Sequence, residues 1–234
     1  FKEAYAESSN PFNLKMMRLS DQSKVLLLFL TLLIIFAWSA INPHDILTWA
    51  LEVFPVVIGV VILVSTYHLF KFTTFAYLMI WMHSIILMIG GHYTYSEMPL
   101  FNWIRDAFEL SRNNYDKVGH LAQGFFPAII AREILLRKSP LKRDGWLFFI
   151  AVSICLAISA FYELIEWWVA LLTGTAAEAF LATQGDIWDT QSDMALALIG
   201  AIVSLLLLGR VHDRFLDRME AKEIRDYNRI FSKR

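Results

Sequence analysis

The stretch WLFFIAVSICLAISAFYELIEWWVALL, from Trp146 to Leu172, decides the fold class of this chain. It is long and apolar enough to cross a bilayer, whose hydrocarbon core of about 30 Å needs roughly 20 mostly apolar residues. Two carboxylates, Glu163 and Glu166, interrupt its second half. Carboxylates inside a membrane segment are costly and by default mark functional sites. The stretch therefore predicts a membrane-spanning helix that carries part of a site.

Five further apolar runs accompany this one, and 57% of the chain is hydrophobic. Charged residues make up 18%, below the share of about a quarter in ordinary soluble domains. Lipid leaves every backbone polar group to be paired within its own segment, so helices are expected. The alternating pattern of an outer-membrane barrel is absent. The predicted fold is an all-α polytopic membrane protein, with transmembrane helices over residues 25–41, 46–67, 72–90, 118–136, 146–172 and 191–208.

Other features narrow the class of protein further. The single cysteine, Cys155, lies in an apolar run, so an intramolecular disulfide is impossible and a cysteine-based zinc site is not expected. The first apolar run is long enough to remain in the membrane, and we expect no secretory signal peptide. The chain has no internal repeat, no separate soluble domain and no sign of a nucleic-acid partner.

The distribution of basic residues predicts the orientation. Lys and Arg gather before residue 25, in RKSPLKRDG at residues 137–145, and after residue 209, whereas Thr173–Thr190 contains none. By the positive-inside rule, the basic regions and both termini face the cytoplasm. The predicted organisation is a cytoplasmic tail over residues 1–24, a six-helix membrane domain over residues 25–209 and a charged cytoplasmic helix over residues 210–234.

With this orientation, the unusual ionisable residues all fall at the outer end of the bundle. The motif YDKVGH, residues 115–120, opens one span, and GGHYTYSE, residues 90–97, closes another. The last span follows QGDIWDTQSD, residues 184–193. Together with the pair in the opening stretch, the candidates are His92, Glu97, Asp116, His120, Glu163, Glu166, Asp186, Asp189 and Asp193.

Helical spacing places several candidates on common faces, because residues three or four apart are neighbours on a helix. Asp116, His120 and Gln123 share one face if their helix extends back far enough. Glu163 and Glu166 share another. The aspartates of the last span share a third, which Asp186 joins if that helix begins early. Helix bundles build metal sites from inward-facing carboxylates and histidines on adjacent helices.

A buried cluster of carboxylates also needs positive charge, and the nearby arginines are few, namely Arg105 and Arg112. We therefore predict one or two divalent ions (Mg, Mn, Ca or Zn). The predicted ligands are Asp116, His120, Glu163, Glu166, Asp186, Asp189 and Asp193. The predicted catalytic residues are His92 and Glu97 as bases and Arg112, which suits phosphate recognition.

Each group also has a plain structural interpretation. Asp116 would cap a helix N-terminus and benefit from the helix dipole. Asp186 and Asp189 would be ordinary loop acids, and Arg112 would contact a lipid headgroup. For Asp116 and His120, acidic partners that recur on the other helices favour the site over this alternative, whereas the alternatives for Asp186, Asp189 and Arg112 stay open.

Four strings resemble those of the YjdF-type bacterial inner-membrane proteins: GGHYTYSEMPLF, SRNNYDKVGHLAQGF, SAFYELIEWW and TQGDIWDTQSDM. The resemblance is strong over residues 71–208 and implies a bacterial inner-membrane location but little chemistry. DKVGH also resembles the start of VanZ-like membrane proteins, which are linked to cell-envelope traits. The segment DTQSDMALALIG departs from their last helix, so nothing further is carried over.

Three functions fit these observations. The first is a metal-dependent enzyme that acts on a lipid or lipid-linked phosphate headgroup at the outer leaflet. The second is a non-enzymatic cell-envelope factor with a structural cation site. The third is a cation or proton transporter, which requires ionisable residues in the inner half, where only Arg132 and Glu133 qualify. Membrane lipids are the expected partners in each case.

Overall fold

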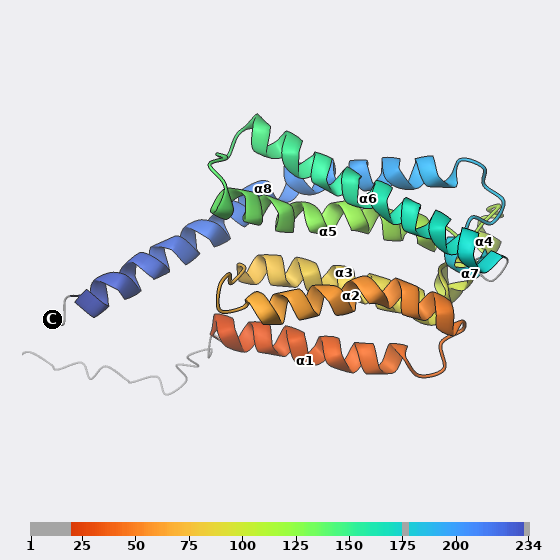
Figure 1. Cartoon of the computed structure of the whole chain (residues 1–234), viewed down its shortest axis with the longest axis horizontal. Coiled ribbons are helices and arrows are strands. Elements are labelled where there is room, and N and C mark those ends of the chain that lie inside the picture. The colour runs from red at the N-terminus through yellow and green to blue at the C-terminus, as the bar shows by residue number, and fades with distance from the viewer. Residues whose placement is uncertain (1–19, 175–177, 232–234) are drawn as a thin grey trace, which may run out of the picture.

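The computed structural model describes residues 20–174 and 178–231. Over these residues the chain is helical without any strand, which confirms the all-α fold class. In chain order (Figure 1), the helices are α1 (Asp21–Ser39), α2 (Ile46–Thr66), α3 (Thr74–Tyr93), the 3-10 helix η1 (Tyr95–Glu97), α4 (Pro99–Ala107), α5 (Tyr115–Lys138), α6 (Gly145–Thr173), α7 (Glu178–Leu181) and α8 (Asp189–Phe231).

In the part of the chain that the structure describes, five helices are long and apolar enough to cross a membrane: α1, α2, α3, α6 and α8. The other predicted span, residues 118–136, lies within α5, which has 24 residues but is not one of the five. Six charged side chains lower the hydropathy of α5, with two at its start, two at its end, and Arg132 and Glu133 between them. In Figure 1, α5 nevertheless runs beside α3 and α6, with which it packs.

α8 is a single helix of 43 residues. The predicted span over residues 191–208 and the predicted charged helix that begins at residue 210 are continuous in it. Its second half projects beyond the bundle (Figure 1), because charged side chains there leave no broad apolar face to bury. Most of the predicted N-terminal tail, residues 1–19, and the last three residues lie outside the described part of the chain.

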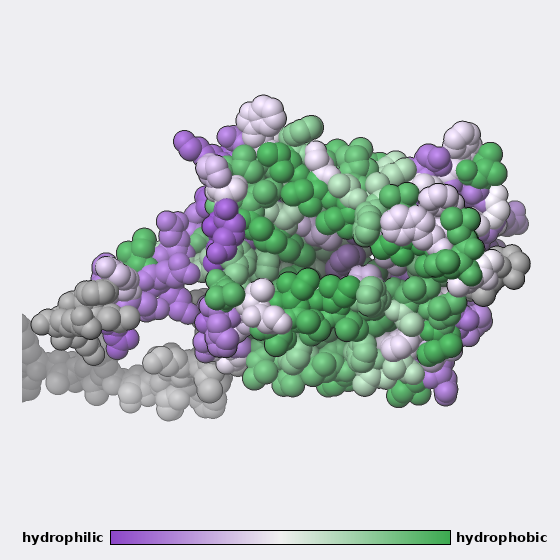
Figure 2. All heavy atoms as spheres, viewed as in Figure 1, coloured by the Kyte–Doolittle hydropathy of each residue, from purple (hydrophilic) through white to green (hydrophobic). Residues whose placement is uncertain are grey.

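The helices form two layers, with α1, α2 and α3 in one and α5, α6 and α8 in the other (Figure 1). One apolar core, around Ile129, Cys155 and Ala201, joins the second layer to Phe75 and Met79 of α3 in the first. Another, around Val53 and Met88, lies in the first. Outside, a broad apolar band separates two hydrophilic ends (Figure 2). Such a large exposed apolar surface is typical of a protein embedded in lipid.

α5 and α8 approach each other closely, and two glycines permit this approach. Gly124 lies against the carbonyl group of Ala197, and Gly200 lies against the carbonyl oxygen of Leu121. A Cβ atom at either glycine would overlap this backbone. Small residues allow helices in membranes to approach in this way. The charged first turns of α5 and α8 are thereby brought together.

Four helices begin at a side chain that caps their first turn: Ser20, Asp45, Thr73 and Asp144. Asp45 accepts a hydrogen bond of 2.7 Å from the backbone N–H of Thr48, and this bond lowers the pKa of Asp45. Such caps satisfy backbone donors that the helix leaves free. They explain why α2 and α3 begin within two residues of their predicted starts.

Candidate metal centre

One end of the second layer holds a cluster of buried ionisable side chains. α5 begins at Tyr115, so Asp116 and His120 lie in its first two turns. Asp193 lies one turn into α8 and Glu163 lies in the second half of α6. The four ionisable residues are only 2% to 7% exposed. The structure therefore brings together predicted ligands from three helices.

His120 lies at the centre of the cluster. Its Nε2 is 3.4 Å from Asp116 Oδ1 and 3.9 Å from Asp193 Oδ2, while its Nδ1 is 3.0 Å from Gln123 Oε1. Because an amide oxygen can only accept, Nδ1 donates its proton to Gln123. In the neutral ring, the lone pair of Nε2 then faces the two aspartates. Metal-binding histidines almost always have such a hydrogen bond at the other ring nitrogen.

Two groups of side chains have the spacing of metal ligands. Asp116, His120 and Asp193 each offer a ligand atom within 4.8 Å of the others, and so do His120, Glu163 and Glu166. Two ligand atoms about 2.1 Å from one tetrahedral ion lie about 3.4 Å apart. The separation of His120 Nε2 and Asp116 Oδ1 has this value.

The carboxylate of Glu163 has a buried oxygen atom whose surroundings independently favour a bound cation or proton. Its Oε1 atom is 3.8 Å from His120 Nδ1, and it is buried with no hydrogen-bond partner among the described residues. A buried carboxylate oxygen without a partner costs free energy. A cation, or a proton on this carboxylate, would remove that cost.

Arg112 pairs with the acidic side chains at the edge of the cluster. Its guanidinium lies 2.6 Å from Asp189, 3.3 Å from Asp116 and 3.4 Å from Asp186. Asp186 and Asp189 belong to neither of the two ligand groups found among the described residues. The structure therefore places these two predicted ligands around Arg112, apart from the group around His120.

Lys117 is a functional candidate that the sequence reasoning missed. Its Nζ lies 2.6 Å from Asp189, 2.9 Å from Asp193 and 2.7 Å from Ser192 Oγ. The signal was present in YDKVGH, where Lys117 directly follows Asp116. The argument that positive charge is scarce here must therefore be corrected, because the protein's own cations neutralise Asp189.

The connection that carries Arg112 is fixed by a fully buried asparagine. The side chain of Asn113 donates to the Met98 carbonyl oxygen and to Asn102 Oδ1. Its backbone N–H and carbonyl oxygen pair with the side-chain amide of Gln184, with both distances 2.9 Å. These bonds join the segment before α5 to the segment before α8, and so hold Arg112 beside the start of α8.

A further polar group lies between the two layers near this end. Glu52 on α2 is 4% exposed and accepts a hydrogen bond of 3.1 Å from the Tyr162 hydroxyl on α6. The ring of Tyr95 in η1 packs against Gly90 and Gly119. Burial raises the pKa of Tyr95 well above its ordinary value. The Tyr95 hydroxyl is therefore a donor near this end and not a base.

The structure does not bring the predicted bases His92 and Glu97 into this cluster. His92 Nδ1 lies 3.1 Å from the Ser39 carbonyl oxygen, and its ring lies 4.4 Å from that of Trp38. Glu97 accepts a hydrogen bond of 3.3 Å from the Asn102 side chain. These contacts connect His92 to the end of α1 and Glu97 to α4. Glu163, which lies inside the cluster, is the better candidate for a base.

A second buried ionic network lies at the opposite end of the bundle. Glu133 accepts hydrogen bonds from the backbone and side chain of Thr73 and forms an ion pair with Arg137. It also lies 3.0 Å from Nε2 of His212, whose Nδ1 accepts from Arg132. The sequence reasoning found the acidic and basic residues of α5 here but missed His212, which lies in the sequence RVHD at residues 210–213.

Comparison with known proteins identifies the family of this chain. Residues 24–214 match the family described as "Predicted membrane protein (DUF2238)". The chain belongs to this family. The inner membrane protein YjdF of Escherichia coli (strain K12) is 48% identical over 189 residues, which cover 81% of this chain and 90% of that relative. No solved structure matches the chain.

The family assignment confirms the resemblance seen in the four sequence strings. The matched region spans α1 to the middle of α8 and so includes the cluster around His120. With its apolar helices and its inner-membrane relative, the chain is an integral, multi-pass protein of the bacterial inner membrane. The family description states no reaction, so any activity has to be argued from the site.

Proposed function

We propose that this inner-membrane protein binds a divalent metal ion through Asp116, His120 Nε2 and Asp193. The orientation of the His120 ring is the observation that carries the proposal. Its Nδ1 is engaged by Gln123 while Nε2 faces two buried carboxylates at ligand spacing. One imidazole and two carboxylates suit Zn²⁺ or Mn²⁺ better than Mg²⁺ or Ca²⁺, which prefer oxygen ligands alone.

The same arrangement supports catalysis. Three protein ligands leave a coordination position for water or substrate, as in catalytic zinc sites. A metal ion there would polarise a phosphoryl oxygen and lower the pKa of bound water. Glu163, with its unpartnered Oε1 beside His120, is positioned to accept a proton. Glu166 completes the second ligand group and would help either to bind the metal ion or to accept a proton.

The substrate follows from charge and location. Arg112 and Lys117 lie beside the proposed metal position, where both also pair with Asp189. Such a pair suits a phosphate group. We therefore propose a metal-dependent enzyme that acts on a lipid or lipid-linked phosphate headgroup.

The proposal includes a topology. We propose that α5 is a sixth span and that both ends of the chain lie in the cytoplasm, so that the cluster faces the outer leaflet. The basic residues of the N-terminal, 137–145 and C-terminal regions support this orientation. The buried charges of α5 support the span, because Arg132 and Glu133 pair with α8 and α3 and do not face lipid.

Elemental analysis of the detergent-purified protein tests the metal site. We expect about one divalent ion per chain in the wild type and roughly 10–100-fold weaker retention in Asp193→Asn. Glu220→Gln, an exposed change on the same helix, is the control and should keep the metal. If the wild type takes up no ion after incubation with Mg, Mn, Ca and Zn, the proposal fails. Retained metal without phosphate release from any lipid would favour a structural cation site in a non-enzymatic factor.

Gln123→Ala tests the role of the second ring nitrogen of His120. Loss of this hydrogen bond should weaken metal binding roughly 10–100-fold while leaving all three ligands in place. Gln191→Ala, an exposed change near the start of α8, should bind metal like the wild type. Titration with Zn²⁺ or Mn²⁺ measures both affinities, and equal values would remove His120 Nε2 from the ligand set.

A cation or proton transporter is the second candidate. It is favoured by the network of Glu133 and His212, both fully buried, because ionisable residues then occupy both ends of the bundle. Proteoliposomes with a trapped pH indicator or a metal-sensitive dye would report such transport. A flux that depends on Glu163 and on Glu133 would favour transport over catalysis.

A further inference from the structure

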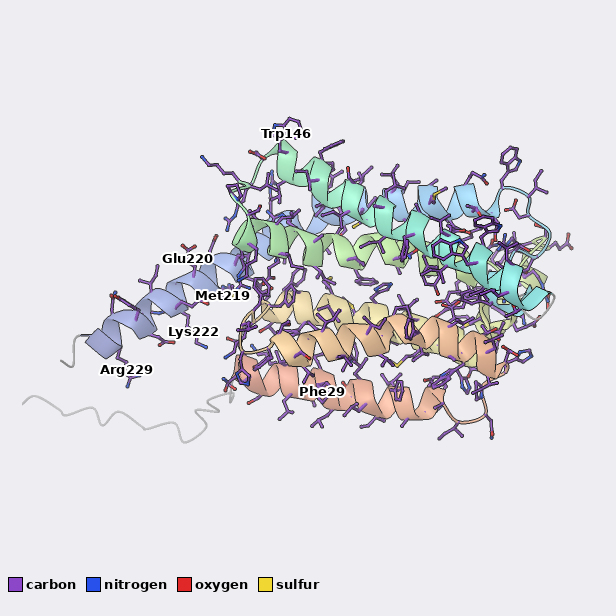
Figure 3. All side chains as sticks on the ribbon, in the orientation of Figure 1. Phe29, Trp146, Met219, Glu220, Lys222 and Arg229 are labelled. Carbon is purple, nitrogen blue, oxygen red and sulfur yellow. The ribbon has the colours of Figure 1, made fainter. Side chains whose placement is uncertain are left out.

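Two neighbouring cavities lie at the end of the bundle opposite the candidate metal centre. The first, of about 350 Å³, is a groove between α1, α2 and α3. Its lining is mainly apolar and includes Leu28, Phe29 and Leu32 of α1 and Leu63 of α2. Phe29 is labelled on α1 in Figure 3. Because this stretch of the chain faces lipid, the groove is open to hydrocarbon and not to water.

The second cavity, of about 430 Å³, continues the first toward the projecting part of α8. Gln22, Val25, Tyr67 and Tyr77 line both cavities. The hydroxyl of Tyr77 is buried at this junction near the backbone of Phe72, and its O–H has no acceptor among the described residues. An apolar groove thus leads into a polar cavity past a buried donor that is available to a ligand.

Charged side chains of both signs line the polar cavity. Asp21 pairs with Lys24 at 3.2 Å and with Lys222 at 3.7 Å. Figure 3 labels Lys222 and Met219 on α8, above the start of α1. Asp21 therefore links the two lysines across the gap between α1 and α8, and the three side chains keep one positive charge in excess.

Two cations and two carboxylates of this cavity form no ion pair among the described residues. Lys71 lies over the ring of Tyr67 at 5.1 Å, and Arg218 lies over that of Phe215 at 5.9 Å. Glu223 and Asp226 follow Arg218 along α8, about 7.5 Å and 12 Å farther along the helix axis at 1.5 Å per residue. The cavity thus presents unpaired positive charge near the groove and unpaired negative charge beyond it.

We propose that the two cavities together bind one zwitterionic phospholipid whose headgroup ends in a primary ammonium. An acyl chain occupies the groove, which follows α1 from Gln22 to Leu32 over about 15 Å. The phosphate lies between Lys71 and Arg218, and the ammonium lies toward Glu223. The order of charges along α8 selects this headgroup, since an anionic lipid would meet both carboxylates. This site is independent of the proposed metal centre.

Native mass spectrometry of the full chain, after delipidation in detergent, tests the proposal. Phosphatidylethanolamine, phosphatidylglycerol and phosphatidylcholine with identical acyl chains are added separately. We expect one phosphatidylethanolamine to be retained per chain, and retention to fall about tenfold in Lys71→Gln/Arg218→Gln. The matched control is Lys142→Gln/Arg214→Gln, which removes two exposed charges at the same end outside both cavities. The control should retain the lipid like the wild type.

A second pair of variants tests the groove. Leu63→Trp fills it and should reduce phosphatidylethanolamine retention, whereas Val61→Trp, at an exposed position of α2, should not. Glycerophosphoethanolamine, which lacks acyl chains, should not displace the lipid. Equal retention of the three lipids, preference for phosphatidylglycerol, equal loss in the controls, or a dimer in place of a lipid adduct would each overturn the proposal.

Discussion

Gly124→Leu is expected to prevent α5 and α8 from packing, and thereby to abolish both the folded bundle and metal binding. The new side chain would occupy the place of the Ala197 carbonyl group. Overpacking of a well-packed core usually costs about 1–3 kcal/mol. We expect more here, because the obstacle is backbone and can yield only if the helices separate. Thermal unfolding in detergent and the yield of monodisperse protein measure the effect.

Gly59→Leu is the matched control for this prediction. It makes the same substitution within α2, where nothing lies within 4 Å of the added Cβ. Its midpoint temperature should remain within a few degrees of the wild type, and its metal content should be unchanged. If Gly124→Leu proves as stable as Gly59→Leu, the close contact of α5 with α8 is contradicted.

Glu133→Ala is expected to destabilise the opposite end of the bundle by about 3–5 kcal/mol, because it leaves buried partners without their acceptor. Glu133 is fully buried. It accepts a hydrogen bond from Thr73 and also contacts Arg137 and His212. Its loss removes the acceptor that fixes the cap of α3 and leaves a buried imidazole N–H unpaired. The free energy of unfolding, measured by titration with a denaturing detergent, gives the size of the effect.

Two variants make this result interpretable. Glu133→Gln keeps an oxygen that can accept from Thr73, so we expect a smaller loss than in Glu133→Ala. Glu220→Ala removes an exposed carboxylate from α8 and should change the free energy of unfolding by less than about 0.5 kcal/mol. A loss below about 1 kcal/mol in Glu133→Ala would mean that the network is not a structural connection.

The cluster around His120 was predictable because helical periodicity and the apolar runs together fix which residues share a face and a depth. Asp116, His120 and Gln123 were expected on one face, and the structure has them in contact. That expectation needed no knowledge of neighbouring helices. Asp186 and Asp189 were also expected among the ligands, since the depth of a residue does not reveal which cation it will meet.

Helical periodicity could not predict contacts between segments that are distant in the sequence. Lys117 is next to Asp116 in sequence, yet its partners lie more than 70 residues away in α8. The same holds for His212, which pairs with Glu133 across 79 residues. A side chain with several rotatable bonds can reach different partners, and only the packing of α5 on α8 selects among them.

The sequence by itself determined that this is an all-helical membrane protein in which Asp116, Glu163 and Asp193 lie near the same end of their helices. Hydrophobic length and charge distribution decide these properties, because the bilayer acts on each segment separately. The tertiary structure alone decided which carboxylates meet His120, which meet Arg112 and Lys117, and which cavities adjoin α8. The physical reason is that ion pairs and ligand sets depend on distances of a few ångströms between helices. In this protein, two glycines at the crossing of α5 and α8 set those distances.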